Sequence, residues 1–191
     1  MRLVGGRLRG KLLTVPEGLA IRPTADRARE NLFNILEHGR AAKLVGLRLN
    51  GAHVLDAFAG TGALGLETFS RGAARVTFMD NTRMARRVLE LNIAACKAGD
   101  SVDIRDCDVT NPPLAPAPAD LVFLDPPYGA DLLVPALEAL EKRGWHKDST
   151  LIVAECGANE ALTLPDFLVE RDRRRYGAAQ FILLSHRMPT D

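Results

Sequence analysis

The chain has 191 residues, of which 47% are hydrophobic and 26% are charged, and its net charge is +1. This composition excludes a disordered chain, and the length predicts that residues 1–191 form a single domain. The sequence shows neither an apolar run long enough to cross a membrane nor the apolar region of a signal peptide, so we expect a cytoplasmic protein without a membrane partner. The three cysteines and four histidines are widely spaced, which predicts neither a disulfide framework nor a metal site.

The N-terminal segment differs in charge from the rest of the chain. Residues 1–30 carry seven Arg and Lys against three acids, whereas the remaining residues carry 18 against 21. A basic segment indicates contact with a polyanion, although a solvated surface segment has the same composition. Two short strands, at about residues 1–4 and 11–15, are expected to flank a turn that contains glycine. We therefore divide the chain into a basic hairpin extension, residues 1–24, and a core, residues 25–191.

The core is predicted to begin with a helix over about residues 25–37 and then to alternate strands with helices. The expected strands cover about 54–56, 75–80, 102–105, 120–125 and 150–155, with helices at about 62–70, 82–97 and 131–142. Two final strands, at about 168–175 and 179–185, meet at Gly177. This alternation predicts an α/β fold: a Rossmann-like, mostly parallel sheet with an antiparallel C-terminal hairpin.

Acidic residues lie at the predicted carboxyl ends of several strands. Asp56, Asp80 and Asp125 lie at or near such ends, and Asp106 follows a fourth strand. Ligands of parallel α/β sheets bind beyond the carboxyl ends of the strands. We therefore expect these carboxylates to surround a cofactor pocket.

A glycine-rich loop indicates which cofactor this pocket holds. Residues 60–65, Gly-Thr-Gly-Ala-Leu-Gly, match the pattern G-x-G-x-x-G between a strand and a helix, and Asp80 lies 20 residues beyond Gly60. Glycines that serve only helix packing would give the same pattern. A dinucleotide presents a pyrophosphate, which needs bare amides, whereas S-adenosylmethionine presents an ammonium group, which needs an acceptor. Asp56 would repel the pyrophosphate and bind the ammonium group, so the sequence favours S-adenosylmethionine.

The cofactor site is predicted to draw residues from three strand ends. The candidates after the first strand are Asp56, Phe58, Gly60 and Gly62. Asp80 is expected to hydrogen-bond the ribose hydroxyl groups. Asp106, followed by the small Cys107, is expected to bind the adenine amine. Asp108 is the alternative for that contact, because spacing does not separate the two acids.

The candidate catalytic residues are Asp125, Pro126, Pro127 and Tyr128, which follow the fourth predicted strand. An ordinary turn would also fit this segment. An exocyclic base amine is a poor nucleophile because its lone pair is delocalised, and two acceptors that hold its N–H groups direct the lone pair at a methyl donor. The Asp125 carboxylate and the Pro126 carbonyl would supply these acceptors, and the Tyr128 ring would stack on the base. An in-line displacement of this kind needs no metal.

With these motifs identified, the sequence resembles the bacterial RsmD family of small-subunit ribosomal RNA guanine-N2 methyltransferases. The resemblance covers nearly the whole chain and rests on residues 1–6, 22–34, 56–65, 66–67, 70–73, 125–128 and 175–177. It implies a class I Rossmann-like domain with a small N-terminal hairpin extension, and S-adenosylmethionine as the methyl donor. The implied acceptor is a guanine of 16S ribosomal RNA within the small subunit or its assembly intermediate. We expect the enzyme to act as a monomer.

Basic residues near the N-terminus are the candidates for RNA binding. They are Arg7, Arg9 and Lys11 on the hairpin, Arg22 and Thr24 at the expected mouth of the pocket, and Arg27 or Arg29 on the first helix. Thr24 is also the expected N-cap of that helix. A helix whose charged side chains only face solvent would have the same local sequence.

Three other functions fit parts of the sequence. The Asp125–Tyr128 segment also fits a DNA adenine-N6 or cytosine-N4 methyltransferase, but 191 residues leave little room for the target-recognition region of such an enzyme. The glycine pattern also fits an NAD(P)-dependent oxidoreductase, although no hydride-handling site is evident. A non-catalytic RNA-binding module would tolerate the loss of Asp125.

Overall fold

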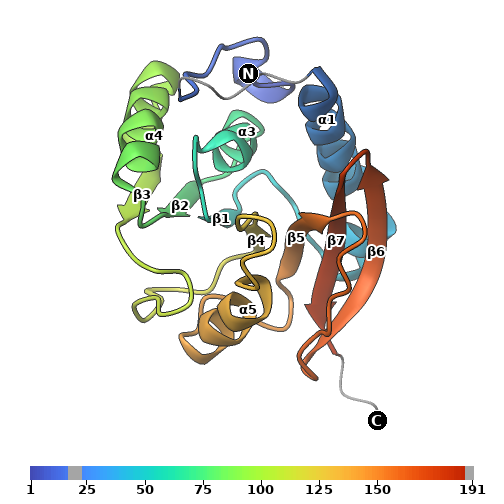
Figure 1. The fold of residues 1–191 in the computed structure, drawn as a ribbon. Coiled ribbons are helices and arrows are strands. Elements are labelled where there is room, and N and C mark those ends of the chain that lie inside the picture. The colour runs from blue at the N-terminus through green and yellow to red at the C-terminus, as the bar shows by residue number, and fades with distance from the viewer. Residues whose placement is uncertain (17–22, 188–191) are drawn as a thin grey trace.

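The computed structural model describes residues 1–16 and 23–187, which contain a seven-stranded sheet with strand order β3-β2-β1-β4-β5-β7-β6 (Figure 1). The strands are β1 (His53–Ala57), β2 (Arg75–Met79), β3 (Val102–Arg105), β4 (Leu121–Leu124), β5 (Leu151–Gly157), β6 (Leu168–Tyr176) and β7 (Ala179–His186). Strands β1 to β5 pair in parallel, whereas β7 is antiparallel to both β5 and β6. The predicted α/β fold, with its parallel sheet and C-terminal hairpin, is confirmed.

Helices cover both faces of this sheet. The helices are α1 (Pro23–His38), α2 (Arg40–Leu44), α3 (Ala63–Ser70), α4 (Arg83–Cys96) and α5 (Leu133–Lys142). Buried side chains of α1, α3 and α4 belong to the apolar core on one face, and those of α5 belong to the core on the other. Among the described residues, no helix combines the length and the apolar character needed to cross a membrane.

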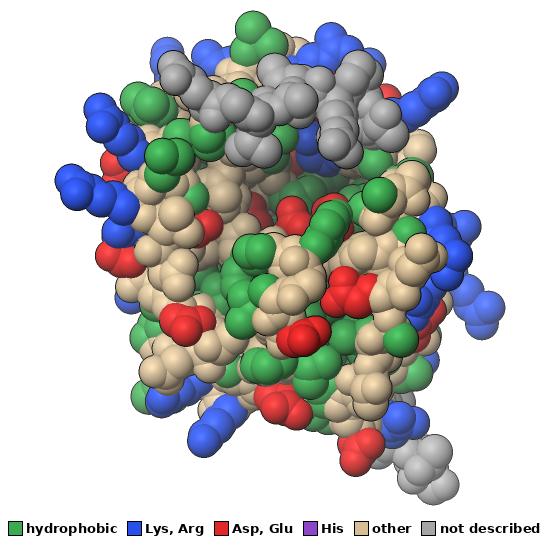
Figure 2. All heavy atoms as spheres, viewed as in Figure 1, with side chains coloured by type: hydrophobic (Ala, Val, Ile, Leu, Met, Phe, Trp, Pro, Cys, Tyr) green, Lys and Arg blue, Asp and Glu red, His purple; other side chains and the backbone are tan. Residues whose placement is uncertain are grey.

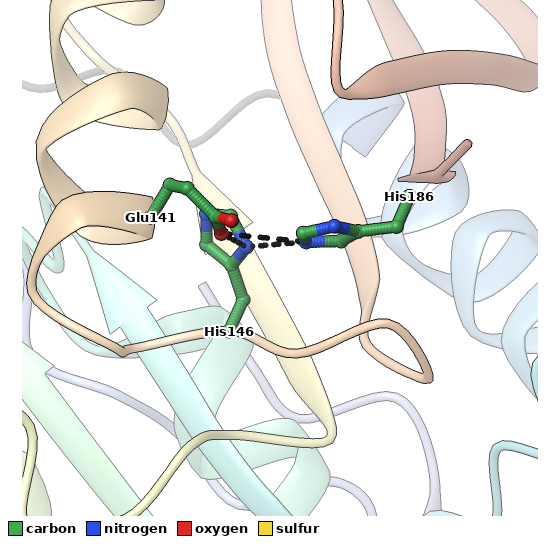
Figure 3. Close-up of side chains that lie close together, drawn as sticks. All are labelled: Glu141, His146 and His186. Carbon is green, nitrogen blue, oxygen red and sulfur yellow. Dashed lines mark hydrogen bonds and ion pairs between the residues drawn. The ribbon is translucent and has the colours of Figure 1, made fainter. Parts of the chain in front are cut away.

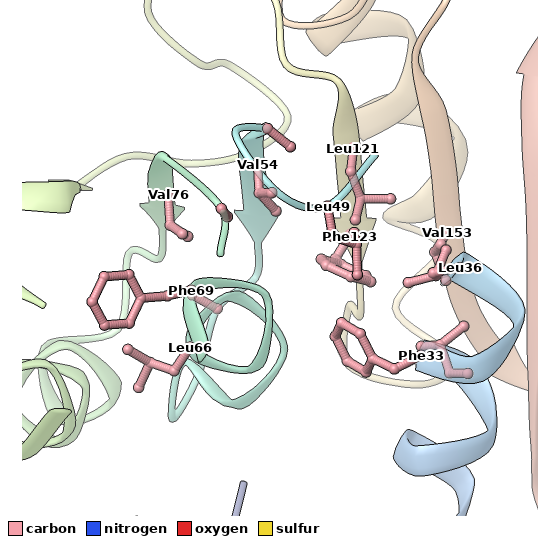
Figure 4. Close-up of a cluster of buried hydrophobic side chains, with 14 of the residues drawn as sticks. Phe33, Leu36, Leu49, Val54, Leu66, Phe69, Val76, Leu121, Phe123 and Val153 are labelled. Carbon is pink, nitrogen blue, oxygen red and sulfur yellow. The ribbon is translucent and has the colours of Figure 1, made fainter. Parts of the chain in front are cut away.

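The two cores are separate because successive side chains of a strand point to opposite faces of the sheet. Val54 of β1 belongs to the core beneath α1 and α3, part of which Figure 4 shows, whereas Leu55 belongs to the core beneath α5. In the first core the rings of Phe33 and Phe123 lie with their centroids 6.0 Å apart. Full burial of each large apolar side chain contributes roughly 1.5–3 kcal/mol, and this contribution holds the helices on the sheet.

The N-terminal extension differs from the predicted two-stranded hairpin. Its two arms meet at a single antiparallel bridge between Arg2 and Leu12, and a 3₁₀ turn covers Gly6–Leu8. The prediction of two strands was wrong in extent because part of the backbone bonds to side chains of the core. The Val4 amide, for example, donates to Glu67 Oε2 on α3 over 2.7 Å.

Two helix assignments also differ from the sequence-based expectation. Helix α1 begins at Pro23, so Thr24 lies within its first turn and is not its N-cap. Proline suits this position because it lacks the amide hydrogen that a first turn leaves unbonded. The five-residue helix α2 was not predicted, because Ala41 and Ala42 are its only buried residues and form no periodic pattern.

Candidate active site

The carboxyl ends of the parallel strands open onto two adjoining cavities of about 600 and 740 Å³. Both cavities are lined by Phe58, Gly60, Asp125, Tyr128 and Glu155. Figure 2 shows acidic side chains in a hollow of the visible face and Arg or Lys side chains at its periphery, over α4 and beside β6 and β7. These two cavities lie beyond the strand ends, where the sequence predicts the pocket.

The loop between β1 and α3 leaves the cavities open because of its backbone conformation. Phe58, Gly60 and Gly62 all have positive φ, of 63°, 54° and 77°. A Cβ atom on Gly60 would meet only the Phe58 carbonyl oxygen, at 3.9 Å, so a side chain there would occupy cavity space. Gly62 lines neither cavity, and a Cβ atom on it would lie 2.3 Å from Leu89 Cδ1 of α4. Gly60 therefore makes room for a ligand, and Gly62 makes room for a helix.

Two buried carboxylates hold this loop in place. Asp56, at the end of β1, accepts a hydrogen bond of 2.8 Å from the Gly65 amide. Asp80 accepts bonds of 2.9 Å from the Gly60 amide and 2.7 Å from the Thr82 amide. Asp56 lines the first cavity and Asp80 lines the second, so each of them both supports the loop and faces a possible ligand.

Three carboxyl groups gather around the first cavity, on Asp56, Asp125 and Glu155. Burial raises the pKa of Asp56 to about 7, although the hydrogen bond from the Gly65 amide acts in the opposite direction and lowers this pKa. Asp125 opens to the cavity but is otherwise surrounded by protein, and burial, with repulsion from Glu155 and Asp56, raises its pKa well above the usual value. Burial also raises the pKa of Glu155. Such a cluster favours protons or a bound cation.

Glu155 is a site residue that the sequence analysis missed. It lies near the carboxyl end of β5, at the same edge of the sheet as Asp56, and it accepts a hydrogen bond of 2.7 Å from the Tyr128 hydroxyl group. The signal was available, because Glu155 ends a predicted strand as Asp56 does. Tyr176 and Gly177, at the β6–β7 turn, line the first cavity and were also missed as site residues.

The Asp125–Tyr128 segment lies where the two cavities join. Pro126 and Pro127 line the second cavity, and Tyr128 lines both, with a side chain 54% exposed. Burial and the hydrogen bond to Glu155 raise the pKa of Tyr128, so its phenol stays protonated and its ring remains a neutral flat surface. All four predicted catalytic residues thus lie together at one cavity wall.

The structure separates the two acids considered for the adenine contact. Asp106 forms an ion pair with Arg86 and lines neither cavity. Cys107 and Asp108 both line the second cavity, beside Asp80. Of the two acids it is Asp108, which the sequence analysis ranked second, that faces the space available for a ligand.

The N-terminal extension reaches the first cavity through Met1 and is fixed by buried polar side chains. Asn92 of α4 accepts a bond of 2.7 Å from the Thr14 amide and donates to the Thr14 and Thr61 carbonyl oxygens, over 3.0 and 2.9 Å. Asn92 therefore joins the extension to the glycine-rich loop.

Among the basic residues proposed for RNA binding that the structure describes, Arg29 lines a cavity and the others do not. Arg29 is buried and lines the first cavity. It pairs with Asp26 over 2.8 Å and donates to the Arg2 carbonyl oxygen, so it joins α1 to the N-terminal extension instead of facing an exposed phosphate. Arg27 is exposed and lines neither cavity. Arg22 and the side chain of Thr24 lie outside the described residues.

Arg7, Arg9 and Lys11 are exposed on the turn of the extension and do not line either cavity. The Arg7 guanidinium group lies 4.2 Å from the centre of the Phe69 ring of α3. Arg7 thus lies against α3, and all three residues face solvent. An RNA would have to extend beyond the cavities to reach them.

Comparison with known proteins decides the family. The family described as Conserved hypothetical protein 95 matches residues 1–185. Ribosomal RNA small subunit methyltransferase D of Escherichia coli is 39% identical over 166 residues, which are 86% of this chain and 79% of that protein. The chain belongs to the RsmD family.

Further similarities support this membership. The enzyme of the same name from Haemophilus influenzae is 31% identical over 170 residues, covering 87% of this chain and 83% of its own. A solved structure described as the putative methyltransferase yhhF from Escherichia coli is 35% identical, with a TM-score of 0.79 over 97% of both chains. The resemblance found in the sequence is therefore confirmed, and membership in this methyltransferase family decides against the oxidoreductase alternative.

Proposed function

We propose that this protein transfers a methyl group from S-adenosylmethionine to the N2 amine of a guanine in 16S ribosomal RNA. The substrate would be the small ribosomal subunit or its assembly intermediate. The observation that carries the proposal is the placement of Asp125 and Tyr128 where two cavities join, in a chain 39% identical to Ribosomal RNA small subunit methyltransferase D. The cofactor would then extend from the second cavity into the first, and the base would enter beside it at Asp125 and Tyr128.

The residues of the cavities fit S-adenosylmethionine. Asp56 would accept its ammonium group, and that cation would favour the ionised form of a carboxyl group whose pKa is otherwise raised. Asp80 and Asp108, in the second cavity, would hold the ribose hydroxyl groups and the adenine amine. The open space at Gly60 would let the backbone approach the ligand closely. When bound, the cofactor supplies an activated methyl group on a sulfonium.

Asp125 and Tyr128 would orient the guanine. The Tyr128 ring, held by its hydrogen bond to Glu155, offers a stacking surface worth roughly 1–3 kcal/mol per base. Asp125 would accept a hydrogen bond from an N–H group of the exocyclic amine, and this bond would direct the lone pair of the amine nitrogen at the methyl carbon. The N–C bond forms as the C–S bond breaks, and the surplus proton leaves the nitrogen. Asp125 and Glu155 are suited to take it because their pKa values are raised.

The charge distribution favours a neutral base over a phosphate inside the site. Carboxylates around the first cavity repel the RNA backbone, whereas exposed Arg7, Arg9 and Lys11 on the extension attract it. A guanine in structured RNA would have to leave its stack to enter, at a cost of a few kcal/mol.

The decisive experiment offers radiolabelled S-adenosylmethionine with three acceptors: undermethylated small subunits, naked 16S ribosomal RNA and duplex DNA. The product is digested, and its nucleosides are identified by mass spectrometry. We expect N2-methylguanosine from the subunits, and naked RNA shows whether ribosomal proteins help to present the base. Label in DNA alone would overturn the proposed substrate and favour the DNA methyltransferase alternative, and label in an RNA base other than guanine would overturn the proposed target.

A further inference from the structure

A second polar cluster lies at the opposite edge of the sheet from the cavities. Glu141 comes from the last turn of α5, His146 from the loop before β5, and His186 from the end of β7 (Figure 3). His146 Nδ1 lies 2.8 Å from His186 Nε2 and 2.9 Å from Glu141 Oε2. His186 Nε2 and Glu141 Oε2 are 3.5 Å apart. Three potential ligand atoms therefore converge from three separate segments.

The outer ring nitrogens indicate where the imidazole protons reside. His146 Nε2 lies 3.4 Å from the Leu137 carbonyl oxygen, and His186 Nδ1 lies 3.5 Å from an Asp148 carboxylate oxygen. Because both outer nitrogens face acceptors, we assign the ring protons to them. The two inner nitrogens then present lone pairs to one another and to the Glu141 carboxylate.

Three acceptors this close repel one another unless a cation lies between them. Glu141 Oε2 is buried and, within the described part of the chain, has no hydrogen-bond partner. A proton shared between the two imidazoles would leave that oxygen unsatisfied, whereas one metal ion satisfies all three atoms at once. We propose that Glu141, His146 and His186 bind a divalent transition metal ion of the zinc class.

The geometry and the surroundings fit such an ion. Zinc binds imidazole nitrogen and carboxylate oxygen at about 2.0–2.2 Å, which places tetrahedral ligand atoms roughly 3.3 Å apart, close to the observed separations. Hydrogen bonds from metal-bound histidines to a carbonyl or carboxylate are typical of such sites, and Leu137 and Asp148 provide both. The side chain of Glu141 is 38% exposed, so a water molecule can complete the coordination.

The metal would serve the fold rather than the transfer reaction. It would join α5 and the following loop to the end of β7, where the Phe167 ring packs against both imidazoles. The spacing of the histidines along the sequence gave no sign of this site, because 40 residues separate His146 from His186.

The test titrates untagged, chelator-treated protein with Co²⁺ and Zn²⁺. We expect one Co²⁺ per chain with the visible absorption bands of a tetrahedral complex, which Zn²⁺ abolishes. Zn²⁺ at about 100 times its Kd should raise the melting temperature by roughly 5–10 °C. Glu141→Gln, a substitution of equal size at a partly exposed residue, should weaken Co²⁺ binding at least tenfold and leave methyl transfer unchanged.

The matched control is His38→Gln, which alters an exposed histidine on α1 and should bind Co²⁺ like the unaltered chain. Two results would overturn the proposal. One is the absence of tetrahedral bands and of a melting shift in the unaltered protein. The other is equal Co²⁺ binding by Glu141→Gln, which remains informative even if substitutions of the buried histidines prevent folding.

Discussion

The two edges of the sheet each hold a cluster of acceptors, but the clusters enclose different spaces. At the carboxyl edge, Asp56, Asp125 and Glu155 surround a cavity of about 600 Å³. At the amino edge, the ligand atoms of the histidine cluster lie within 4.8 Å of one another. Both arrangements favour a cation, and the enclosed volume decides which kind: an organic cation with a base beside it in one case, a single metal ion in the other.

The largest expected effect lies at the carboxyl edge. Asp125→Ala should reduce kcat about 10²–10³-fold, since it removes an acceptor from the amine as positive charge develops there. S-adenosylmethionine binding should change little, and the variant should stay folded because repulsion within the carboxyl cluster falls. Single-turnover methyl transfer and calorimetry measure the two quantities. Asp100→Ala, at an exposed acid outside both cavities, is the control, and near-normal turnover of Asp125→Ala would remove this residue from the mechanism.

The second prediction concerns the cation expected at Asp56. The pKa of Asp56 is raised to about 7 in the folded protein, whereas the unfolded chain ionises at about pH 4. The folded protein therefore loses stability as the pH rises from about 4 to 7. An ammonium group favours the ionised form, so cofactor binding should release a proton. Affinity should then rise by up to about tenfold per pH unit between pH 5 and 7.

Calorimetry in two buffers of different ionisation enthalpy measures this proton release directly. Asp56→Asn should bind more weakly at pH 7 and release no proton. If the unaltered protein and Asp56→Asn show the same pH dependence, another group binds the ammonium group. The carboxyl cluster would then not be the cation site that the comparison with the histidine cluster assumes.

A smaller effect is expected on the surface of the N-terminal extension. Neutralising Arg7, Arg9 and Lys11 together should weaken RNA binding and reduce the slope of log K against log salt concentration by roughly 2–3. The matched control neutralises three exposed residues that line neither active-site cavity: Lys43, Arg48 and Lys142. Equal slopes for the two triple variants, measured by filter binding across salt concentrations, would place the RNA surface elsewhere.

The smallest effect is expected for Tyr128→Phe. This change removes a hydrogen bond to Glu155 and keeps the ring, so activity should fall by about fivefold, corresponding to about 1 kcal/mol. Tyr128→Ala removes the stacking surface as well and should cost more. Comparison of kcat/KM for the two variants separates the ring from the hydroxyl group. Equal losses would show that the hydroxyl group, not stacking, is what the site uses.

The carboxyl edge was largely predictable because its residues follow local patterns. Asp56, Asp80 and Asp125 each come at or just after the end of a strand, and parallel strands bring their ends to the same edge. The glycine loop was likewise predictable. The sequence did not show that Gly60 leaves space for a ligand whereas Gly62 leaves space for α4. The choice between Asp106 and Asp108 depended on which side chain faces the cavity, and Arg86 draws Asp106 away from it.

The sequence by itself determined the order of the strands and of the longer helices, the edge that carries the pocket, and the family, since alternating periodicity and strand-end acids are local properties of the chain. The tertiary structure alone decided the rest. It directed part of the backbone of the N-terminal arms to side chains such as Glu67, joined Glu155 to Tyr128, and brought Glu141 and His146 to His186. These contacts join segments far apart in sequence, and packing fixes them where spacing cannot.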